Sequence, residues 1–164
     1  MPKHPLISVI MNCYNGKRYL SEAIDSVISQ TYGHWELIFW DNQSTDMSAS
    51  IVKSYSDIRI RYFYAENHTN LGAARNLALM ETRGVWVGFL DVDDLWFPEK
   101  LETQVGEILK EKEDVGLCYS RCEFFQDIDK PSLTFRDSKI YPSSKTLPNE
   151  WIKEELFVGN LIPF

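Results

Sequence analysis

Three aspartates follow directly on an apolar, β-prone run, and their spacing suggests chemistry. The run covers residues 85–90 (VWVGFL), and Asp91, Asp93 and Asp94 come next. Such a run is typical of a strand buried on both faces. Carboxylates grouped at the end of a buried strand repel one another and are costly to desolvate, so a cation between them would relieve that cost. Oxygen ligands of this kind suit Mg²⁺ or Mn²⁺.

The same aspartates have a second interpretation. An isolated Asp-x-Asp pair is a weak signal. A solvated acidic turn, with Asp94 capping the next helix, would use the same residues. Spacing alone leaves both interpretations open.

Composition and charge indicate one ordinary globular domain. A chain of 164 residues, 44% hydrophobic and 25% charged, is long enough to bury a substantial core. The net charge of −7 argues against nucleic-acid binding, because no basic patch offsets it. No run of 18 apolar residues and no signal peptide is recognisable, which favours a cytoplasmic protein with reduced thiols at Cys13, Cys118 and Cys122.

Apolar periodicity predicts strands that alternate with helices. Strands are expected over 6–11, 35–40, 59–64, 85–90 and 115–125, and helices over 19–30, 47–55, 73–82 and from 98 onward. Ser21 is a candidate cap for the first helix and Asp46 for the second. Residues 126–146 are expected to form an irregular loop, 148–157 a short helix, and 158–164 the start of an apolar element. The alternation predicts an α/β fold with a mostly parallel sheet flanked by helices.

Polar side chains follow three of the expected strands. Asn12 and Tyr14 follow the first, Asp41 and Asn42 follow the second, and the aspartates follow the central one. Ligands of open α/β sheets bind at the carboxyl ends of the strands, so these groups are expected on one edge. Arg75, near the positive end of its helix, would add an anion contact. The combination suits a nucleoside diphosphate that chelates a divalent cation.

Several enzyme classes are unlikely because their motifs are missing. The chain has no G-x-x-x-x-G-K-[ST] loop, which argues against a P-loop kinase or ATPase. No G-x-G-x-x-G follows the first strand, which argues against a dinucleotide-dependent dehydrogenase. No nucleophile elbow or Ser-His-Asp set is visible.

Three segments resemble the N-terminal half of family 2 glycosyltransferases, which have the GT-A fold. They read SVIMNCYNGKRYLSEAIDSVISQTYGHWELIFWDNQSTD, NLGAARNLAL and GFLDVDDLWFPEKL, in the family's order, within residues 7–122. The resemblance implies inverting transfer of a sugar from a nucleotide-sugar, most often a UDP-sugar, to a glycan or lipid-linked acceptor, with Mn²⁺ or Mg²⁺. It also implies that residues 1–164 are the nucleotide-sugar-binding part of a single GT-A domain, truncated before its acceptor-side half.

The resemblance implies roles for the residues on the nucleoside side. Tyr14 would stack on the base, Asn12 and Asn42 would line the base pocket, and Asp41 would hold the turn or reach the nucleoside. Many members have two successive acids where this chain has Asp41 and Asn42, and the second acid commonly accepts the imide hydrogen of uracil. An Asn carbonyl can also accept that hydrogen, but the amide nitrogen could serve a different base. UDP is therefore the favoured but open expectation.

The resemblance implies a second set of roles on the diphosphate side. Arg75 would approach the diphosphate or the base, Asp91 would lie by the ribose or the metal, and Asp93 would be the main metal ligand. The catalytic base is expected beyond residue 164. Membrane contact would come only through segments outside this sequence, which places the protein in the cytoplasm or at the inner face of the membrane.

Two other functions remain as alternatives. A sugar nucleotidyltransferase would also use an α/β sheet, a metal and acids, although no Gly-rich loop bearing Arg or Lys follows the first strand. A non-catalytic nucleotide-binding module, with a degenerate acidic edge, is the other.

Overall fold

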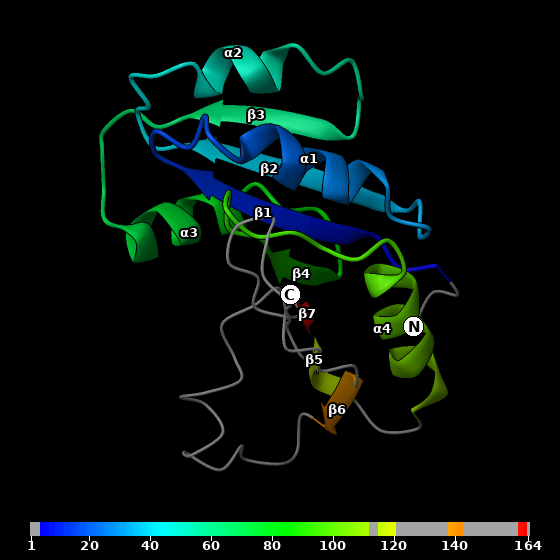
Figure 1. Ribbon diagram of the computed structural model, residues 1–164. Coiled ribbons are helices and arrows are strands. Elements are labelled where there is room, and N and C mark those ends of the chain that lie inside the picture. The colour runs from blue at the N-terminus through cyan, green and yellow to red at the C-terminus, as the bar shows by residue number, and fades with distance from the viewer. Residues whose placement is uncertain (1–3, 112–114, 121–137, 143–160, 164) are drawn as a thin grey trace, which may run out of the picture.

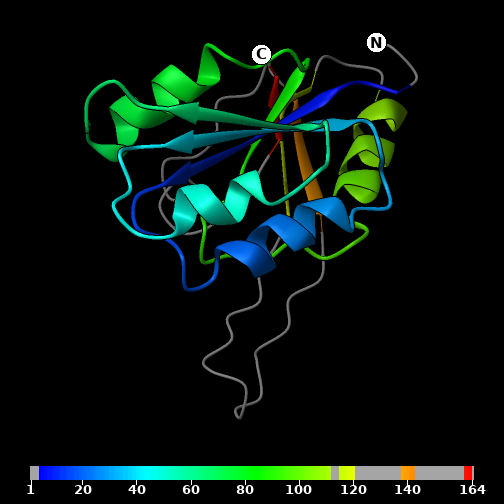
Figure 2. The same cartoon turned by 90° about the horizontal axis from the view of Figure 1, so that it is seen from above.

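The computed structural model describes residues 4–111, 115–120, 138–142 and 161–163. Within these residues seven strands form one sheet in the order β3-β2-β1-β4-β7-β5-β6, with helices on both faces (Figures 1 and 2). The strands are β1 (Ile7–Cys13), β2 (Trp35–Asp41), β3 (Ile60–Tyr64), β4 (Trp86–Phe89), β5 (Val115–Ser120), β6 (Ser138–Pro142) and β7 (Leu161–Pro163). The helices are α1 (Leu20–Ile28), α2 (Ser48–Lys53), α3 (Leu71–Leu79) and α4 (Lys100–Lys110).

The first four strands are parallel, as the sequence predicts. β1 lies between β2 and β4, and β2 also pairs with β3. In register, Val9 lies opposite Leu37 of β2 and Gly88 of β4. The carboxyl ends of all four strands therefore meet at one edge, on the left in Figure 1.

Alternate residues of β1 face the two helical layers. Ile7, Val9 and Met11 enter the larger core cluster together with the apolar stripe of α1 and with Leu101 of α4. Ile10 faces the other way and packs in a second cluster that includes Ala78 of α3. Figure 2 shows α1 and α2 on one side of the sheet and α3 on the other. Because both faces are covered, every residue of β1 is buried.

The remaining three strands are antiparallel, and one of them corrects an expectation. β7 lies between β4 and β5, and β6 pairs with β5 at the outer edge. The expectation of an irregular loop over 126–146 is wrong at β6, because the five residues of this strand are ordered by pairing with a distant strand. The predicted helix over 148–157 and the last part of the predicted strand over 115–125 lie outside the described residues.

The expected cap Ser21 is wrong, and so is the cap that the second interpretation of the acidic turn assigned to Asp94. The N-cap of α1 is Tyr19, without a side-chain cap bond, and Ser21 lies inside the helix. Asp94 does not cap α4, since that helix begins at Lys100 after its N-cap Glu99. α3 begins at Leu71, earlier than expected, because the Asn70 side chain caps it by accepting the Ala73 N–H at 2.9 Å.

A buried carboxylate fixes the amino end of β4. Glu36 Oε1 accepts from the Ser8 hydroxyl and the Arg83 N–H, each at 2.7 Å, and its Oε2 accepts from Arg61 at 2.9 Å. The Gly84 N–H donates to Ser8 Oγ at 2.8 Å. A Cβ at Gly84 would lie 2.6 Å from the carbonyl oxygen of the residue before β1, so only glycine fits. This network holds β4 in register beside β1.

Two further findings concern the lengths of the helices and the state of the cysteines. Among the described residues, no helix combines the length and the apolar character needed to cross a membrane. Cys13 and Cys118 are free, buried thiols, as expected. Burial raises the pKa of both, and that of Cys118 reaches about 12.

Candidate functional site

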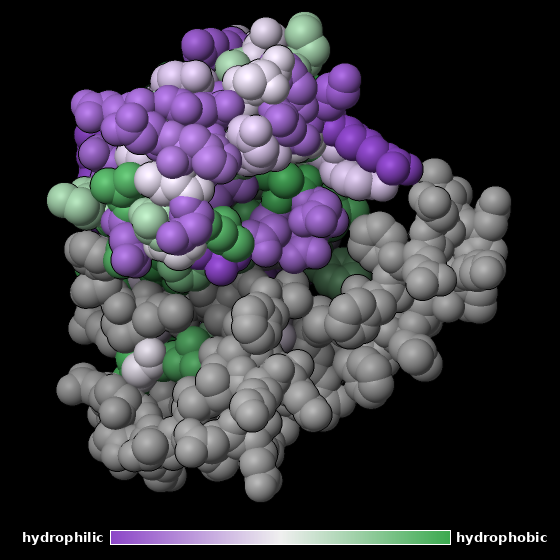
Figure 3. All heavy atoms as spheres, turned by 90° about the vertical axis from the view of Figure 1, so that its left-hand side faces the viewer, coloured by the Kyte–Doolittle hydropathy of each residue, from purple (hydrophilic) through white to green (hydrophobic). Residues whose placement is uncertain are grey.

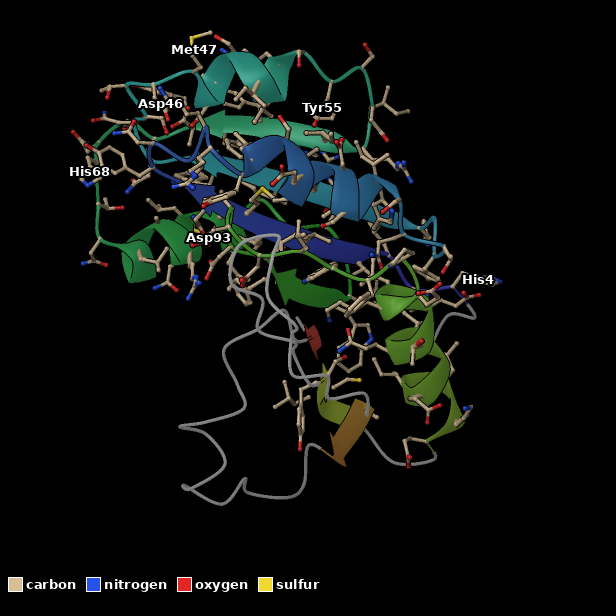
Figure 4. The ribbon with its side chains drawn as sticks, in the orientation of Figure 1. His4, Asp46, Met47, Tyr55, His68 and Asp93 are labelled. Atoms are coloured by element: carbon tan, nitrogen blue, oxygen red, sulfur yellow. The ribbon has the colours of Figure 1, made fainter. Side chains whose placement is uncertain are left out.

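The turns that follow β1, β2 and β4 meet at the carboxyl edge of the parallel strands. Figure 4 labels Asp46, His68 and Asp93 at this end of the molecule. Figure 3 views the same end, and among the described residues in its upper part hydrophilic ones predominate, with a few apolar ones among them. This edge contains every site residue that the sequence predicts.

The turns after β1 and β2 are interlocked through short polar side chains. The Asn15 N–H donates to Ser44 Oγ, and the Gly16 N–H donates to Ser48 Oγ, both at 3.0 Å. In return, Asn15 Oδ1 accepts the Thr45 N–H at 2.8 Å. Asn15 adopts a left-handed φ of 56°, a strained conformation that the surrounding bonds maintain. Sequence reasoning assigned no role to Asn15 or Ser48, because the bonds between the two turns depend on tertiary closure.

Asp46 completes this interlock. Its carboxylate accepts the Ser48 N–H at 2.9 Å, the Ser48 hydroxyl at 2.6 Å and the Lys17 N–H at 3.1 Å. Partial desolvation opposes ionisation, but these hydrogen bonds outweigh it and lower the pKa of Asp46. The formal N-cap of α2 is Met47, and the Asp46 carboxylate supplies the side-chain bond to the helix start.

Asp41 is fully buried and has both carboxylate oxygens engaged within the protein. Oδ1 accepts the Ser44 N–H and Oδ2 accepts the Tyr62 hydroxyl, each at 2.7 Å. Burial, followed by this bond to a carboxylate, raises the pKa of Tyr62. Asp41 thus holds the turn after β2, which is one of the two roles expected for it.

Asn42 joins the turn after β2 to the segment 65–70. Its N–H donates to the Cys13 carbonyl at 2.8 Å, and its Nδ2 donates to the Thr69 carbonyl at 2.7 Å. Its Oδ1 accepts the Thr69 N–H at 3.1 Å and the Thr69 hydroxyl at 3.3 Å. Asn42 is buried, so these bonds fix the segment against the ends of β1 and β2.

Tyr14 contacts an aromatic residue that sequence reasoning left out of the site. The Tyr14 side chain is 54% exposed, and its ring centroid lies 4.4 Å from that of His68, with the planes tilted by 57°. His68 Nδ1 lies 2.8 Å from the Asn42 carbonyl. His68 is exposed, as a surface residue would be, but it stands beside the predicted base-stacking ring.

Asn12 has a buried side chain that lacks partners. It is 9% exposed, and neither its Oδ1 nor its Nδ2 forms a hydrogen bond within the described residues. Its partner in register on β2 is Trp40, whose buried Nε1 also forms no hydrogen bond with the described residues. An unpaired buried amide costs free energy unless a water or a ligand satisfies it.

An ion pair joins α3 to the turn after β4. Arg75 donates to Asp91 Oδ1 at 2.8 Å, and its guanidinium lies 5.6 Å from the centre of the Phe89 ring. The two paired side chains are 31% and 41% exposed. An ion pair this open to water contributes only about 0.2–1 kcal/mol to the free energy of folding. Its contribution to stability therefore does little to explain why these two charged residues are present at this edge.

The acidic turn has the chemistry of a divalent cation site. Burial, and then the charges of Asp91 and Asp93, raise the pKa of Asp94. Asp93 is exposed. No group of three His, Cys, Asp or Glu in the described ranges is arranged to hold a metal alone. One or two carboxylates nevertheless fit Mg²⁺ or Mn²⁺ when substrate phosphates supply further ligands.

The acidic turn is fixed by packing and by its continuation toward α4. A Cβ on Gly16 would lie 2.9 Å from a methyl carbon of Val92, so the turns after β1 and β4 are in close contact. Further along, Gln30 Nε2 donates to the Phe97 carbonyl at 2.8 Å, and Gln30 Oε1 accepts the Leu101 N–H at 3.0 Å. Sequence reasoning gave Gln30 no role, since a lone Gln at a helix end carries no recognisable signal.

Comparison with curated proteins finds glycosyltransferases. The chain is 37% identical over 122 residues to UDP-Glc:alpha-D-GlcNAc-diphosphoundecaprenol beta-1,3-glucosyltransferase WfgD of Escherichia coli, covering 74% of this chain and 47% of that protein. It is 42% identical over 103 residues to the putative teichuronic acid biosynthesis glycosyltransferase TuaG of Bacillus subtilis, covering 62% and 41%. The chain therefore spans less than half the length of either relative.

Solved structures show the same fold. The structure of S. aureus TarS 1–349 in complex with UDP-GlcNAc superposes with a TM-score of 0.63 and 30% identity, covering 66% of this chain and 32% of that TarS 1–349 chain. Residues 8–158 match the family described as glycosyl transferase family 2, which is most of the chain. Because the matching family consists of glycosyl transferases, the match argues against the nucleotidyltransferase alternative. The chain belongs to glycosyl transferase family 2.

Proposed function

We propose that the carboxyl edge binds a UDP-sugar and that the protein transfers its sugar, with inversion, to a glycan or lipid-linked acceptor. The observation that carries the proposal is the buried, unpartnered carboxamide of Asn12 at the end of β1, two residues before the exposed ring of Tyr14. A free hydrogen-bonding group and a stacking surface on the same strand end suit a nucleoside. The name of WfgD, which includes UDP-Glc and a lipid diphosphate, and the UDP-GlcNAc complex of TarS support the choice of donor and acceptor.

Four residues of the edge have a role on the nucleotide side of this proposal. Tyr14 stacks on the base, and Asn12 forms a hydrogen bond to the nucleoside. Asp41 keeps the turn after β2 in place, since both of its oxygens are already engaged. Arg75 lies at the edge with its side chain partly exposed, where it meets the diphosphate.

Asp93 and Asp91 would hold Mn²⁺ or Mg²⁺, which would neutralise charge on the departing diphosphate. Asp94 is more buried than Asp93, and we assign it no direct contact with the metal. A carboxylate base beyond residue 164 would take the proton from the acceptor hydroxyl. We place the reaction in the cytoplasm, at the membrane face where a lipid-linked acceptor would be met.

The test compares two acidic residues of the same exposure class. Asp93→Asn removes a proposed metal ligand, whereas Glu111→Gln removes an exposed acid at the C-cap of α4, a helix that lies on the opposite side of Figure 1 from this edge. Calorimetric titration with UDP in Mn²⁺ should show at least about tenfold weaker binding for Asp93→Asn and unchanged binding for Glu111→Gln. Equal affinity in both variants would remove Asp93 from the site.

A further inference from the structure

The Asn42 side chain is already engaged within the protein. Its Nδ2 donates to the Thr69 carbonyl at 2.7 Å, and its Oδ1 accepts two bonds from Thr69 at 3.1 and 3.3 Å. A nucleobase could be recognised by this carboxamide only if those bonds were displaced. Other groups are therefore better placed to hold the base.

Two neighbouring residues hold the same segment. Gln43 Nε2 donates to the Glu66 carbonyl at 2.8 Å, and Gln43 adopts a left-handed φ of 68°. His68 Nδ1 lies 2.8 Å from the Asn42 carbonyl, and because a carbonyl only accepts, Nδ1 carries the hydrogen. Residues 66–69 are thus bonded at three points to the turn after β2.

The consequence of this bonding is the position of the His68 ring. It lies 4.4 Å from the Tyr14 ring, centre to centre, and the two planes are tilted by 57°. Aromatic pairs at such distances attract one another beyond simple area burial. Tyr14 is 54% exposed, so without His68 its ring would have more rotamer freedom to lose when a ligand stacks on it.

We propose that Asn42 and His68 are positioning residues for Tyr14. Asn42 holds residues 66–69, His68 holds the Tyr14 ring, and Tyr14 stacks on the nucleobase; this inference rests on the proposed nucleotide function. Stacking does not depend on the hydrogen-bonding edge of the base, so Asn42 does not set base selectivity. This positioning role also explains why residue 42 is Asn. An Asp at this position would place a carboxylate oxygen against the Thr69 carbonyl, where the Asn42 Nδ2 donates a hydrogen bond.

The first experiment measures UDP and CDP affinity of the 164-residue chain by calorimetry in Mn²⁺. Asn42→Asp removes the donor to Thr69, and Gln43→Met removes the donor to Glu66 without adding charge. We expect each variant to bind both nucleotides more weakly, by roughly 2- to 12-fold, with the UDP-to-CDP ratio unchanged. A changed ratio in Asn42→Asp would show that Asn42 recognises the base directly, and full affinity in Gln43→Met would show that anchoring residues 66–69 does not affect binding. Either result would overturn the inference.

The second experiment separates the ring of His68 from its hydrogen bond. His68→Phe keeps an aromatic ring beside Tyr14, and His68→Gln keeps a donor for the Asn42 carbonyl but no ring. We expect His68→Phe to bind UDP within about threefold of the original chain and His68→Gln to lose roughly 2- to 12-fold. The opposite order would overturn the role of the ring, and thermal unfolding of both variants excludes a general loss of folding.

The two proposals fail in different ways. An unaltered chain that binds neither nucleotide, although folded, refutes the nucleotide function and this inference with it. Binding by the unaltered chain with variants that behave contrary to these expectations refutes the inference alone.

Discussion

Replacing Asn12 by Leu should stabilise the fold and weaken the ligand site at the same time. The carboxamide is 9% exposed, and both of its polar atoms lack partners within the described residues. Leaving a polar group buried without a partner costs about 1–3 kcal/mol, and Leu has nearly the same shape without that cost. The expected gain of about 1–3 kcal/mol corresponds to a rise in Tm of roughly 2–12 °C for a domain of this size.

The same change removes the hydrogen bond that Asn12 is proposed to give the nucleoside. A ligand atom left unsatisfied in the site should weaken UDP binding by roughly 5- to 150-fold. Thermal unfolding and calorimetric titration of the same preparation measure both effects, and gain of stability with loss of function is typical of binding residues. A variant that is less stable and binds UDP normally would refute the reasoning, since the carboxamide would then serve the fold.

Three further predictions concern other contacts of the same sheet. Arg75→Met should change the free energy of unfolding by less than about 1 kcal/mol, because the ion pair between Arg75 and Asp91 is partly exposed. The same variant should bind UDP at least about tenfold more weakly, and unchanged affinity would contradict this prediction. Gly84→Ala should cost at least about 1–3 kcal/mol in chemical denaturation, because the new Cβ meets backbone atoms 2.6 and 2.7 Å away, and a neutral result would refute that crowding. Tyr62→Phe should lower stability by about 1–3 kcal/mol at neutral pH by leaving an Asp41 oxygen unpaired. The pKa of Tyr62 is raised in the fold, so the Tyr62 hydroxyl contributes its full stabilisation below the unfolded pKa near 10 and loses it as the pH rises further. In urea titrations, Tyr62→Phe should therefore lose less free energy of unfolding at alkaline pH than the original chain. Equal losses would exclude this linkage.

The parallel half of the fold could be predicted because its signals are local. The strand over 85–90 is a continuous apolar run, and β4 is buried next to β1 as that pattern requires. β6 could not be predicted in the same way, since five residues with mixed polarity become a strand only through pairing with β5. Pairing between distant segments is a tertiary effect that local periodicity does not record.

The candidate site, like the fold, was predictable where the signals are local and unpredictable where tertiary contacts decide. The rule that strand ends share an edge was sufficient to bring Asn12, Tyr14 and Asp41 together. It did not reveal that Asn42 is bonded to Thr69 or that His68 lies against Tyr14. Both contacts depend on how the segment 65–70 folds back onto the strand ends, and neither Asn42 nor His68 carries a sequence signal that predicts this conformation.

The most direct test of the central claim is calorimetric titration of the chain with UDP in Mn²⁺, followed by EDTA, with GDP, CDP and TDP as comparisons. The account predicts that UDP binds, that it binds more tightly than GDP or TDP, and that EDTA abolishes the heat. A folded chain that binds none of the four diphosphates in the presence of the metal would contradict it.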